Sequence, residues 1–311
     1  MKAVLLPLTL VLILVSGAAH AAIRTTRNIQ YGPDQLQRLD VVAPDQCKSH
    51  PCPVTMWVHG GGWMRGDKGS GDSSNMENVW AQQGIVMVGV DYRLAPNNTG
   101  VQEAEDVASA VAWVHDNIGK FGGDPNRISL LGHSAGAHLV ALVGTNPKFL
   151  GAHHLSPASL ANVFPIDTAS FDLTTSTRFV GRRIEPAFGS DPTALKDASP
   201  IWNVHTGGQY PPFIIAATKV RQDAVSTSQK LLSELQAAGD TAELIIMDYP
   251  GEGQLRAHAS INRDLGNLKS IMLRQKHEFG IKEPIVIFHQ RHKCSGNIPL
   301  HGLKAALRVR E

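Results

Sequence analysis

Apolar residues along the chain follow two different periods, and these alternate between about residues 54 and 247. Continuous apolar runs of the kind that form buried strands occur at 54–58, 85–90, 128–131, 213–217 and 243–247. Between them, apolar positions recur at helical spacing over 102–118, 135–142 and 225–239. Strands that alternate with helices in this way predict an α/β fold with a mostly parallel central sheet and helices on both faces.

Two regions depart from this alternation. Residues 27–43 alternate apolar and polar side chains around Gly32-Pro33-Asp34, which is typical of a hairpin at an antiparallel sheet edge. From about 146 to 212 the pattern loosens and is interrupted by Pro and Gly. Such a stretch between core strands predicts a small cap or loop excursion over a site. From position alone, we expect its apolar residues 163–166 to line a modest pocket.

The N-terminus has the pattern of an export signal. Lys2 provides a positive charge, residues 4–15 form an apolar run, and Ala19-His20-Ala21 matches a small-residue cleavage site. The run is too short for a comfortable membrane span. We therefore expect residues 1–21 to be removed and the mature chain to be secreted or periplasmic, without membrane attachment. An uncleaved membrane anchor is the alternative.

The length and charge of the chain limit the domain organisation that is possible after residue 21. The chain has 311 residues, 42% hydrophobic and 18% charged, which suits one large α/β domain over 22–280. Residues 281–311 are rich in Lys and Arg and form an extension whose structure the pattern does not define. The formal net charge of +2 is too small to indicate a nucleic acid partner. Nothing in the pattern defines the oligomeric state.

Three cysteines follow the predicted signal: Cys47, Cys52 and Cys294. In an oxidising compartment Cys47 and Cys52 are spaced to bridge a short loop bounded by prolines. Cys294 is then left free, or it competes for one of the other two. Two cysteines five residues apart, with no cluster of further ligands, do not indicate a zinc site.

The stretch Gly132-His133-Ser134-Ala135-Gly136 lies between a predicted strand and a predicted helix. It matches the Gly-x-Ser-x-Gly nucleophile elbow, a sharp turn that exposes the serine hydroxyl at a helix N-terminus. The glycines are needed because the turn leaves no room for β-carbons beside it. An ordinary tight turn is the alternative. If Ser134 is a nucleophile, it requires a base, an acid and oxyanion donors elsewhere in the chain. The N–H of Ala135, the residue after it, is the first such donor.

A glycine-rich loop, His59-Gly60-Gly61-Gly62-Trp63, follows the first core strand. Consecutive glycines let the backbone approach a ligand closely and direct N–H groups at it. A phosphate-binding loop is the alternative, but it needs a G-x-G-x-x-G or Gly-Lys-Ser/Thr pattern that is absent here. We therefore expect Gly61 and Gly62 to complete an oxyanion hole. We expect Trp63 to contact the substrate.

Two further candidates follow predicted strands, where sites assemble in open α/β sheets. Asp223 comes after the strand at 213–217, and His258 after the strand at 243–247. A serine nucleophile needs an imidazole to take its proton and a carboxylate to orient that imidazole. We predict His258 as the base and Asp223 as the acid. The alternatives are a helix N-cap role for Asp223, Asp248 as the acid, and His133, His138 or His205 as the base.

Seven motifs together resemble the α/β-hydrolase esterases of the hormone-sensitive-lipase type, and more narrowly their feruloyl/acetyl-xylan esterase-like and arylformamidase-like members. In chain order they are HGGGW at 59–63, GDK at 66–68, DYRLAP at 91–96, FGGDP at 121–125, GHSAG at 132–136, ASPI at 198–201 and HASIN at 258–262. The resemblance covers about 28–275. It implies an α/β-hydrolase fold with Ser134 as nucleophile, Asp223 as acid and His258 as base, and with oxyanion donors at Gly61, Gly62 and Ala135.

The chain departs from this family at the acid. Members usually have a glycine a few residues before it, whereas residues 218–222 contain none. This departure makes Asp223 the least secure of the predicted site residues.

These features predict an exported serine hydrolase that cleaves small acyl or aryl esters through an acyl-enzyme. No cofactor and no metal is expected, and the predicted partner is a small-molecule ester. One alternative is an arylformamidase-type amide hydrolase, which an exported chain fits poorly. The other is a catalytically silent hydrolase fold that only binds. The presence of both Ser134 and His258 disfavours that alternative.

Overall fold

The computed structural model describes residues 22–69, 73–175, 178–249 and 251–264. The predicted signal peptide at 1–21 and the predicted extension at 281–311 lie outside these described residues, as does Cys294.

The described part of the chain builds one eight-stranded sheet with the spatial order β1-β2-β4-β3-β5-β6-β7-β8. The first two strands pair antiparallel, β2 pairs antiparallel with β4, and every later pairing is parallel. The strands are β1 (Ile23–Gln30), β2 (Arg38–Pro44), β3 (Cys52–Val58), β4 (Val86–Val90), β5 (Gly123–His133), β6 (Leu160–Ile166), β7 (Phe213–Thr218) and β8 (Ala242–Met247). This is the mostly parallel α/β sheet that the sequence predicts.

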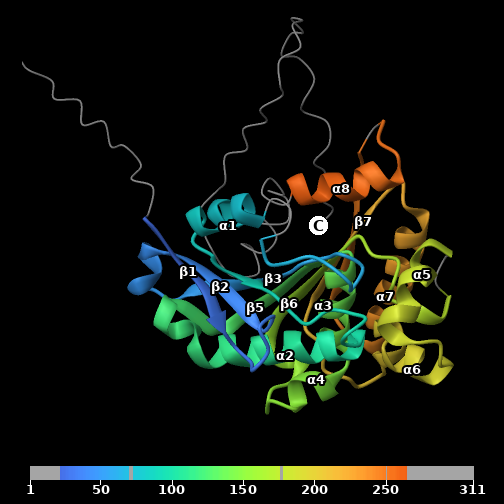
Figure 1. Ribbon diagram of the computed structural model, residues 1–311, viewed down its shortest axis with the longest axis horizontal. Helices are drawn as coiled ribbons and strands as arrows, with labels where there is room; N and C mark the ends of the chain where they lie inside the picture. Colours follow the sequence, from blue (N-terminus) through green and yellow to red (C-terminus); the bar gives the residue numbers. More distant parts are fainter. Residues whose placement is uncertain (1–21, 70–72, 176–177, 250, 265–311) are drawn as a thin grey trace, which may run out of the picture. The chain divides into compact units, whose positions relative to one another are not determined.

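Helices cover both faces of the sheet (Figure 1). In that view α1 and α8 lie above it, and α2 and α4 lie below. Helix α3 packs on α2, β5 and β6, whereas α7 packs on β7 and β8. The helices are α1 (Ser73–Gln82), α2 (Gly100–Asn117), α3 (Ala135–Thr145), α4 (Pro147–Gly151), α5 (Arg178–Phe188), α6 (Pro192–Asp197), α7 (Gln222–Ala238) and α8 (Gln254–Asp264). Five short 3₁₀ segments complete the described elements: η1 (Asp45–Lys48), η2 (Ile118–Phe121), η3 (Pro157–Ser159), η4 (Leu173–Thr175) and η5 (Pro200–Asn203).

The predicted hairpin at 27–43 is confirmed, because β1 and β2 pair antiparallel at one edge of the sheet. The prediction that residues 163–166 line a pocket is wrong. They belong to β6, a central strand between β5 and β7, and their side chains are buried in the core. Only the stretches on either side of β6 form the irregular excursion, with short helices α4, α5 and α6.

Cys47 and Cys52 form a disulfide with their Cα atoms 5.3 Å apart. The bridge joins the short segment η1 to the first residue of β3. Of the helices in the described ranges, none combines the length and the apolar run that a bilayer crossing requires.

Candidate active site

Ser134 lies in a sharp turn between β5, which ends at His133, and α3, which begins at Ala135. Its backbone has φ 58° and ψ −117°, a conformation that a residue with a β-carbon adopts only at a cost. The N–H of Ser134 donates to the carbonyl of Ile166 on β6 at 2.9 Å, which holds the turn against the sheet. The elbow predicted from the glycine pattern is therefore present.

The glycine loop after β3 lies directly beside this turn. A β-carbon at Gly60 would come within 2.8 Å of the carbonyl oxygen of His133 and 3.0 Å of the Ser134 Cβ. Gly61 and Gly62 have φ of +132° and +65°, which glycine adopts at little cost. At Gly60 the loop backbone therefore passes closer to the elbow than any other residue type would allow.

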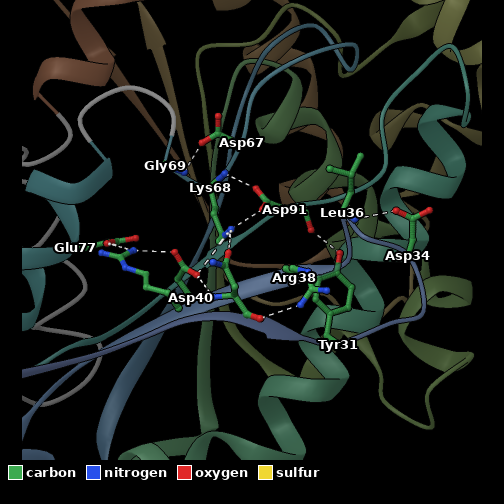
Figure 2. A network of polar contacts seen from close by, with 12 residues as sticks. Tyr31, Asp34, Leu36, Arg38, Asp40, Asp67, Lys68, Gly69, Glu77 and Asp91 are labelled. Atoms are coloured by element: carbon green, nitrogen blue, oxygen red, sulfur yellow. Dashed lines mark hydrogen bonds and ion pairs between the residues drawn. The ribbon is translucent and has the colours of Figure 1, made fainter.

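The segment that follows this loop, up to Lys68, is attached to β2 and to the end of β4 by a network of charged side chains (Figure 2). Lys68 donates its backbone N–H to Oδ1 of Asp91 at 2.5 Å and its ammonium to Oδ2 at 2.7 Å. The carboxylate of Asp91 pairs with Lys68 and not with Arg93 among the described residues. Instead Arg93 pairs with Asp106 on α2 at 2.6 Å, which leaves Asp91 to hold the loop.

Replacing Lys68 with Met is expected to lower the free energy of unfolding by about 2 kcal/mol, because the Asp91 carboxylate, only 13% exposed, would lose its ammonium partner and keep one N–H. Urea denaturation measures the loss. Lys219→Met is the matched control, since the Lys219–Asp248 pair is 61% and 52% exposed and should contribute little. Equal losses in the two variants would contradict the prediction.

Ser134 and the glycine loop open onto a cavity of about 1040 Å³. Its wall combines the loop, the elbow, the ends of β6 and β7 and the start of α8. The lining residues that concern the site are Gly61, Gly62, Trp63, Ser134, Ala135, Arg221, Asp223 and His258. All seven site residues predicted from the sequence therefore line one cavity, although not all of them contact one another.

His258, on α8, is paired with a carboxylate that the sequence did not predict. Its Nδ1 lies 2.6 Å from Oδ2 of Asp167, the residue directly after β6. The Asp167 side chain is fully buried, and its Oδ1 accepts from the N–H and the hydroxyl of Thr218 at 2.8 and 2.9 Å. The carboxylate is therefore held rigidly against the imidazole.

Arg221, in the turn between β7 and α7, closes the other side of this pair. Its Nη1 lies 2.8 Å from the carbonyl oxygen of Asp167, 2.9 Å from Oδ2 and 2.7 Å from Nδ1 of His258. Burial alone would raise the pKa of Asp167. The hydrogen bond from His258 and the charge of Arg221 more than offset this, so the pKa lies well below its usual value. Asp167 is therefore an anion at neutral pH.

The prediction of Asp223 as the partner of His258 differs from the structure. Asp223 lies in the first turn of α7, with Oδ2 3.7 Å from Nη2 of Arg221. The side chain of Arg221 takes the position at Nδ1 that an acid after β7 would need. The other candidate, Asp248, pairs with Lys219 at 2.7 Å and is half exposed. Asp167 is the carboxylate in contact with the imidazole.

Two of the three alternative bases are buried in the core, and the third is exposed. His133 is buried, with its ring centroid 4.4 Å from that of His258, and burial first, then the neighbouring imidazole, lower its pKa well below the usual value. His138 is buried as well, and burial lowers its pKa to about 4. Its Nε2 lies 2.8 Å from the carbonyl of Ala198. His205 is an exposed loop residue that does not line the cavity.

Trp63 lines the cavity with only a small part of its surface, because the residue is 2% exposed. Its indole packs edge-on against the rings of His138 and Phe188, with centroids 5.5 and 5.2 Å away. Trp63 therefore forms part of the cavity floor.

One group of side chains has the composition of a metal site. Ligand atoms of His133, Asp167 and His258 lie within 4.8 Å of one another. However, Asp167 and His258 already contact each other at 2.6 Å, and Arg221 places a guanidinium 2.7 Å from the same ring nitrogen. A fixed positive charge at that distance opposes the binding of a cation by this group.

The model of the BD-FAE family matches residues 39–235 of the chain. The chain belongs to the BD-FAE family. This match spans most of the described domain, from β2 into α7, and includes the glycine loop, the elbow and Asp167. The resemblance to α/β-hydrolase esterases of the hormone-sensitive-lipase type is thereby confirmed.

Curated and solved relatives agree with this family. The chain is 31% identical over 240 residues to esterase LipC of Mycobacterium tuberculosis, covering 73% of this chain and 59% of LipC. The fold is similar to that of esterase B of Lactobacillus rhamnosis, with TM-score 0.67, 18% identity and coverage of 83% and 88%. It is also similar to apo esterase 2 of Thermogutta terrifontis, with TM-score 0.64, 20% identity and coverage of 86% and 98%. At these identities the two structures show the α/β-hydrolase fold alone.

Proposed function

We propose that this BD-FAE family member is a carboxylic ester hydrolase in which Ser134, His258 and Asp167 act as nucleophile, base and acid. The observation that carries the proposal is the contact of 2.6 Å between His258 Nδ1 and the buried Asp167 carboxylate, on the cavity that Ser134 also lines. A serine hydrolase needs such a pair to place a bare ring nitrogen toward the hydroxyl.

The proposed reaction has two stages. The Ser134 hydroxyl oxygen attacks the ester carbonyl carbon while its proton passes to Nε2 of His258, and the Asp167 carboxylate stabilises the resulting imidazolium. The imidazolium then protonates the departing alkoxide, which leaves an acyl-serine. Water, deprotonated by His258, attacks that acyl group and releases the carboxylic acid, and Ser134 regains its proton.

Each tetrahedral intermediate carries a negative oxygen that needs fixed donors. We assign these to the N–H groups of Ala135, Gly61 and Gly62. Ala135 is the first residue of α3, where the N–H groups have no partner within the helix. The glycine loop is held against the elbow and attached at Lys68, so the donors are in place before the charge develops.

The lining of the cavity supports the proposed substrate class. Its floor of glycines and buried Trp63 suits a small acyl or aryl ester. Residues 163–166, which we had expected to help, lie in the sheet and do not line it. The Cys47–Cys52 disulfide and the N-terminal pattern support the proposal that the enzyme acts outside the cytoplasm.

Two measurements on the wild-type chain test the proposal. We expect p-nitrophenyl esters from acetate to decanoate to be hydrolysed, with kcat/KM highest for the short chains. We also expect a fluorophosphonate probe to label one residue, and peptide mass mapping to place the adduct on Ser134. A folded chain that hydrolyses none of the esters and is not labelled contradicts the proposal. Labelling without ester hydrolysis points to another acyl substrate, such as a formamide.

A further inference from the structure

We propose that Arg221 is a positioning residue for the Asp167–His258 pair, whose guanidinium holds the carboxylate in place against the Nδ1–H of the imidazole. The inference rests on the proposed function, because the tautomer matters only if Nε2 of His258 has to accept the Ser134 proton. Its test is therefore chosen to separate a failure of Arg221 from a failure of the triad.

The contacts of Arg221 use the hydrogens of Nη1 completely. This nitrogen carries two hydrogens, and two oxygens of Asp167 lie within reach, the carbonyl at 2.8 Å and Oδ2 at 2.9 Å. Thr218 donates twice to the other carboxylate oxygen. Arg221 is 9% exposed and Asp167 is fully buried, so water does not substitute easily for these donors.

Two groups compete for Nδ1 of His258, namely Oδ2 of Asp167 at 2.6 Å and Nη1 of Arg221 at 2.7 Å. A ring nitrogen has one position in the ring plane, occupied either by a hydrogen or by a lone pair. With the hydrogen on Nδ1, it donates to Oδ2 and Arg221 keeps both bonds to Asp167. Without it, a lone pair faces the carboxylate at 2.6 Å and Arg221 must give up one bond to Asp167.

The count of satisfied hydrogen bonds therefore assigns the proton to Nδ1. That assignment leaves Nε2 bare, and Nε2 is the nitrogen that has to receive the proton of Ser134. Arg221 Nη1 donates both of its hydrogens to oxygens of Asp167, so neither hydrogen is donated to Nδ1 of His258. A side chain without these hydrogens leaves Oδ2, the oxygen that faces the ring, without the Arg221 donor, so that only Thr218 still holds the carboxylate.

Charge gives a second, measurable effect. The groups that face the His258 imidazole are Asp167 after β6, Arg221 before α7, the neutral His133 at the end of β5, and Asp223 on α7 behind the guanidinium. Asp167 favours the imidazolium and Arg221 opposes it. Removing Arg221 therefore makes the resting imidazole easier to protonate, which inactivates the enzyme at a higher pH.

The experiment measures kcat and KM for p-nitrophenyl acetate from pH 5 to 10. For Arg221→Met we expect kcat to fall about 10- to 100-fold with KM nearly unchanged, the usual effect of removing a supporting partner of an active-site residue. We also expect the acid limb of the profile to move to higher pH. Arg221→Lys should keep the limb near its wild-type position but lose part of kcat, because an ammonium lacks the planar fork.

Lys219→Met is the control. It removes a cation two residues away that is 61% exposed and pairs with Asp248 outside the cavity, so rate and pH profile should match the wild type. ¹⁵N-histidine NMR adds a readout that loss of stability does not mimic. We expect the ring of His258 to carry its proton on Nδ1 in the wild type and also in Arg221→Met, because Asp167 remains the acceptor at Nδ1.

Two outcomes overturn the inference. One is a wild-type pH profile and kcat in Arg221→Met, and the other is a wild-type His258 ring that carries its proton on Nε2. If Arg221→Met does not fold, Arg221→Lys is the deciding variant. A lowered kcat together with an acid limb at its wild-type position supports the inference. An unchanged kcat contradicts it. If Asp167→Asn also retains the wild-type rate, the error lies in the proposed triad.

Discussion

Asp167→Asn is expected to lower kcat by about 10³- to 10⁴-fold and to leave KM nearly unchanged, as loss of the orienting carboxylate does in serine hydrolases. The physical reason is a reversed hydrogen bond. An amide oxygen at this position is held by Thr218 through two donors, and the amide nitrogen then faces Nδ1 of His258. A donor there stabilises the tautomer with the proton on Nε2, and that nitrogen no longer accepts the proton of Ser134.

The measurement is kcat and KM for p-nitrophenyl acetate, with Ser134→Ala as the reference for residual activity. Asp223→Asn is the matched control, an aspartate on the same cavity whose carboxylate is directed at Arg221 and 3.7 Å from it. We expect this variant to change kcat by no more than a few-fold. If Asp223→Asn costs more than Asp167→Asn, the acid belongs after β7, as the sequence alone predicted.

Glu103→Gln is expected to stabilise the protein by a few kcal/mol at pH 8.5 and to have almost no effect near pH 4.5. Glu103 lies in the first turn of α2 and is fully buried. Its Oε1 accepts the N–H of Ala95 at 3.2 Å, and among the described residues its Oε2 has no hydrogen-bond partner. Burial is the main cause that raises its pKa from 4.5 to about 9, with Asp106 adding to it and the Ala95 bond opposing it.

The sign follows from the two protonation states. Between pH 4.5 and 9 the folded chain keeps the proton of Glu103 and the unfolded chain releases it. The stability that the protonated group provides is therefore complete below about pH 4.5 and decreases as the pH rises toward 9, by up to about 1.4 kcal/mol per pH unit. Glutamine keeps the oxygen for Ala95 and has no proton to lose.

Urea denaturation of the wild type and Glu103→Gln from pH 4.5 to 9 tests this prediction. We expect the wild-type midpoint to fall with pH and the variant to be flatter. Glu105→Gln, an exposed residue on the same helix, should follow the wild type. A wild-type midpoint that does not change over this range, or a variant weaker than the wild type at pH 8.5, would show that Glu103 is ionised in the folded protein.

The parts of the fold that the sequence predicted are those in which local pattern and tertiary role coincide. The strand β5 and the helix α3 have clear periods, and the glycines around Ser134 reflect a steric need of the turn itself. The hairpin β1–β2 likewise has its turn residues at 32–34, between two alternating segments. These features require only neighbours in sequence, so residue types alone define them.

Asp167 is not among the residues that the sequence predicted for the site, because the strand before it, β6, was not predicted. Residues 163–166 include Pro165, which cannot donate to a sheet ladder and therefore argues against a central strand. In the structure Pro165 of β6 is paired with Gly132 of β5, and β6 continues to Ile166. Asp167 directly follows the end of a core strand. Asp223 and His258 were predicted as site residues because they also follow core strands. The pairing of Asp167 with His258 depends on strand order, which residue patterns do not specify.

The adjacency of β6 and β7 has a consequence for how enzymes of this architecture are recognised. Two neighbouring strand ends face one imidazole, so a carboxylate from either end has access to the same nitrogen. The partner of His258 lies 91 residues before it in the chain, far outside any short acid-to-histidine spacing. A search that fixes that spacing would classify this chain as having a degenerate or missing acid. Enumerating the residues at both strand ends would find the carboxylate that contacts His258.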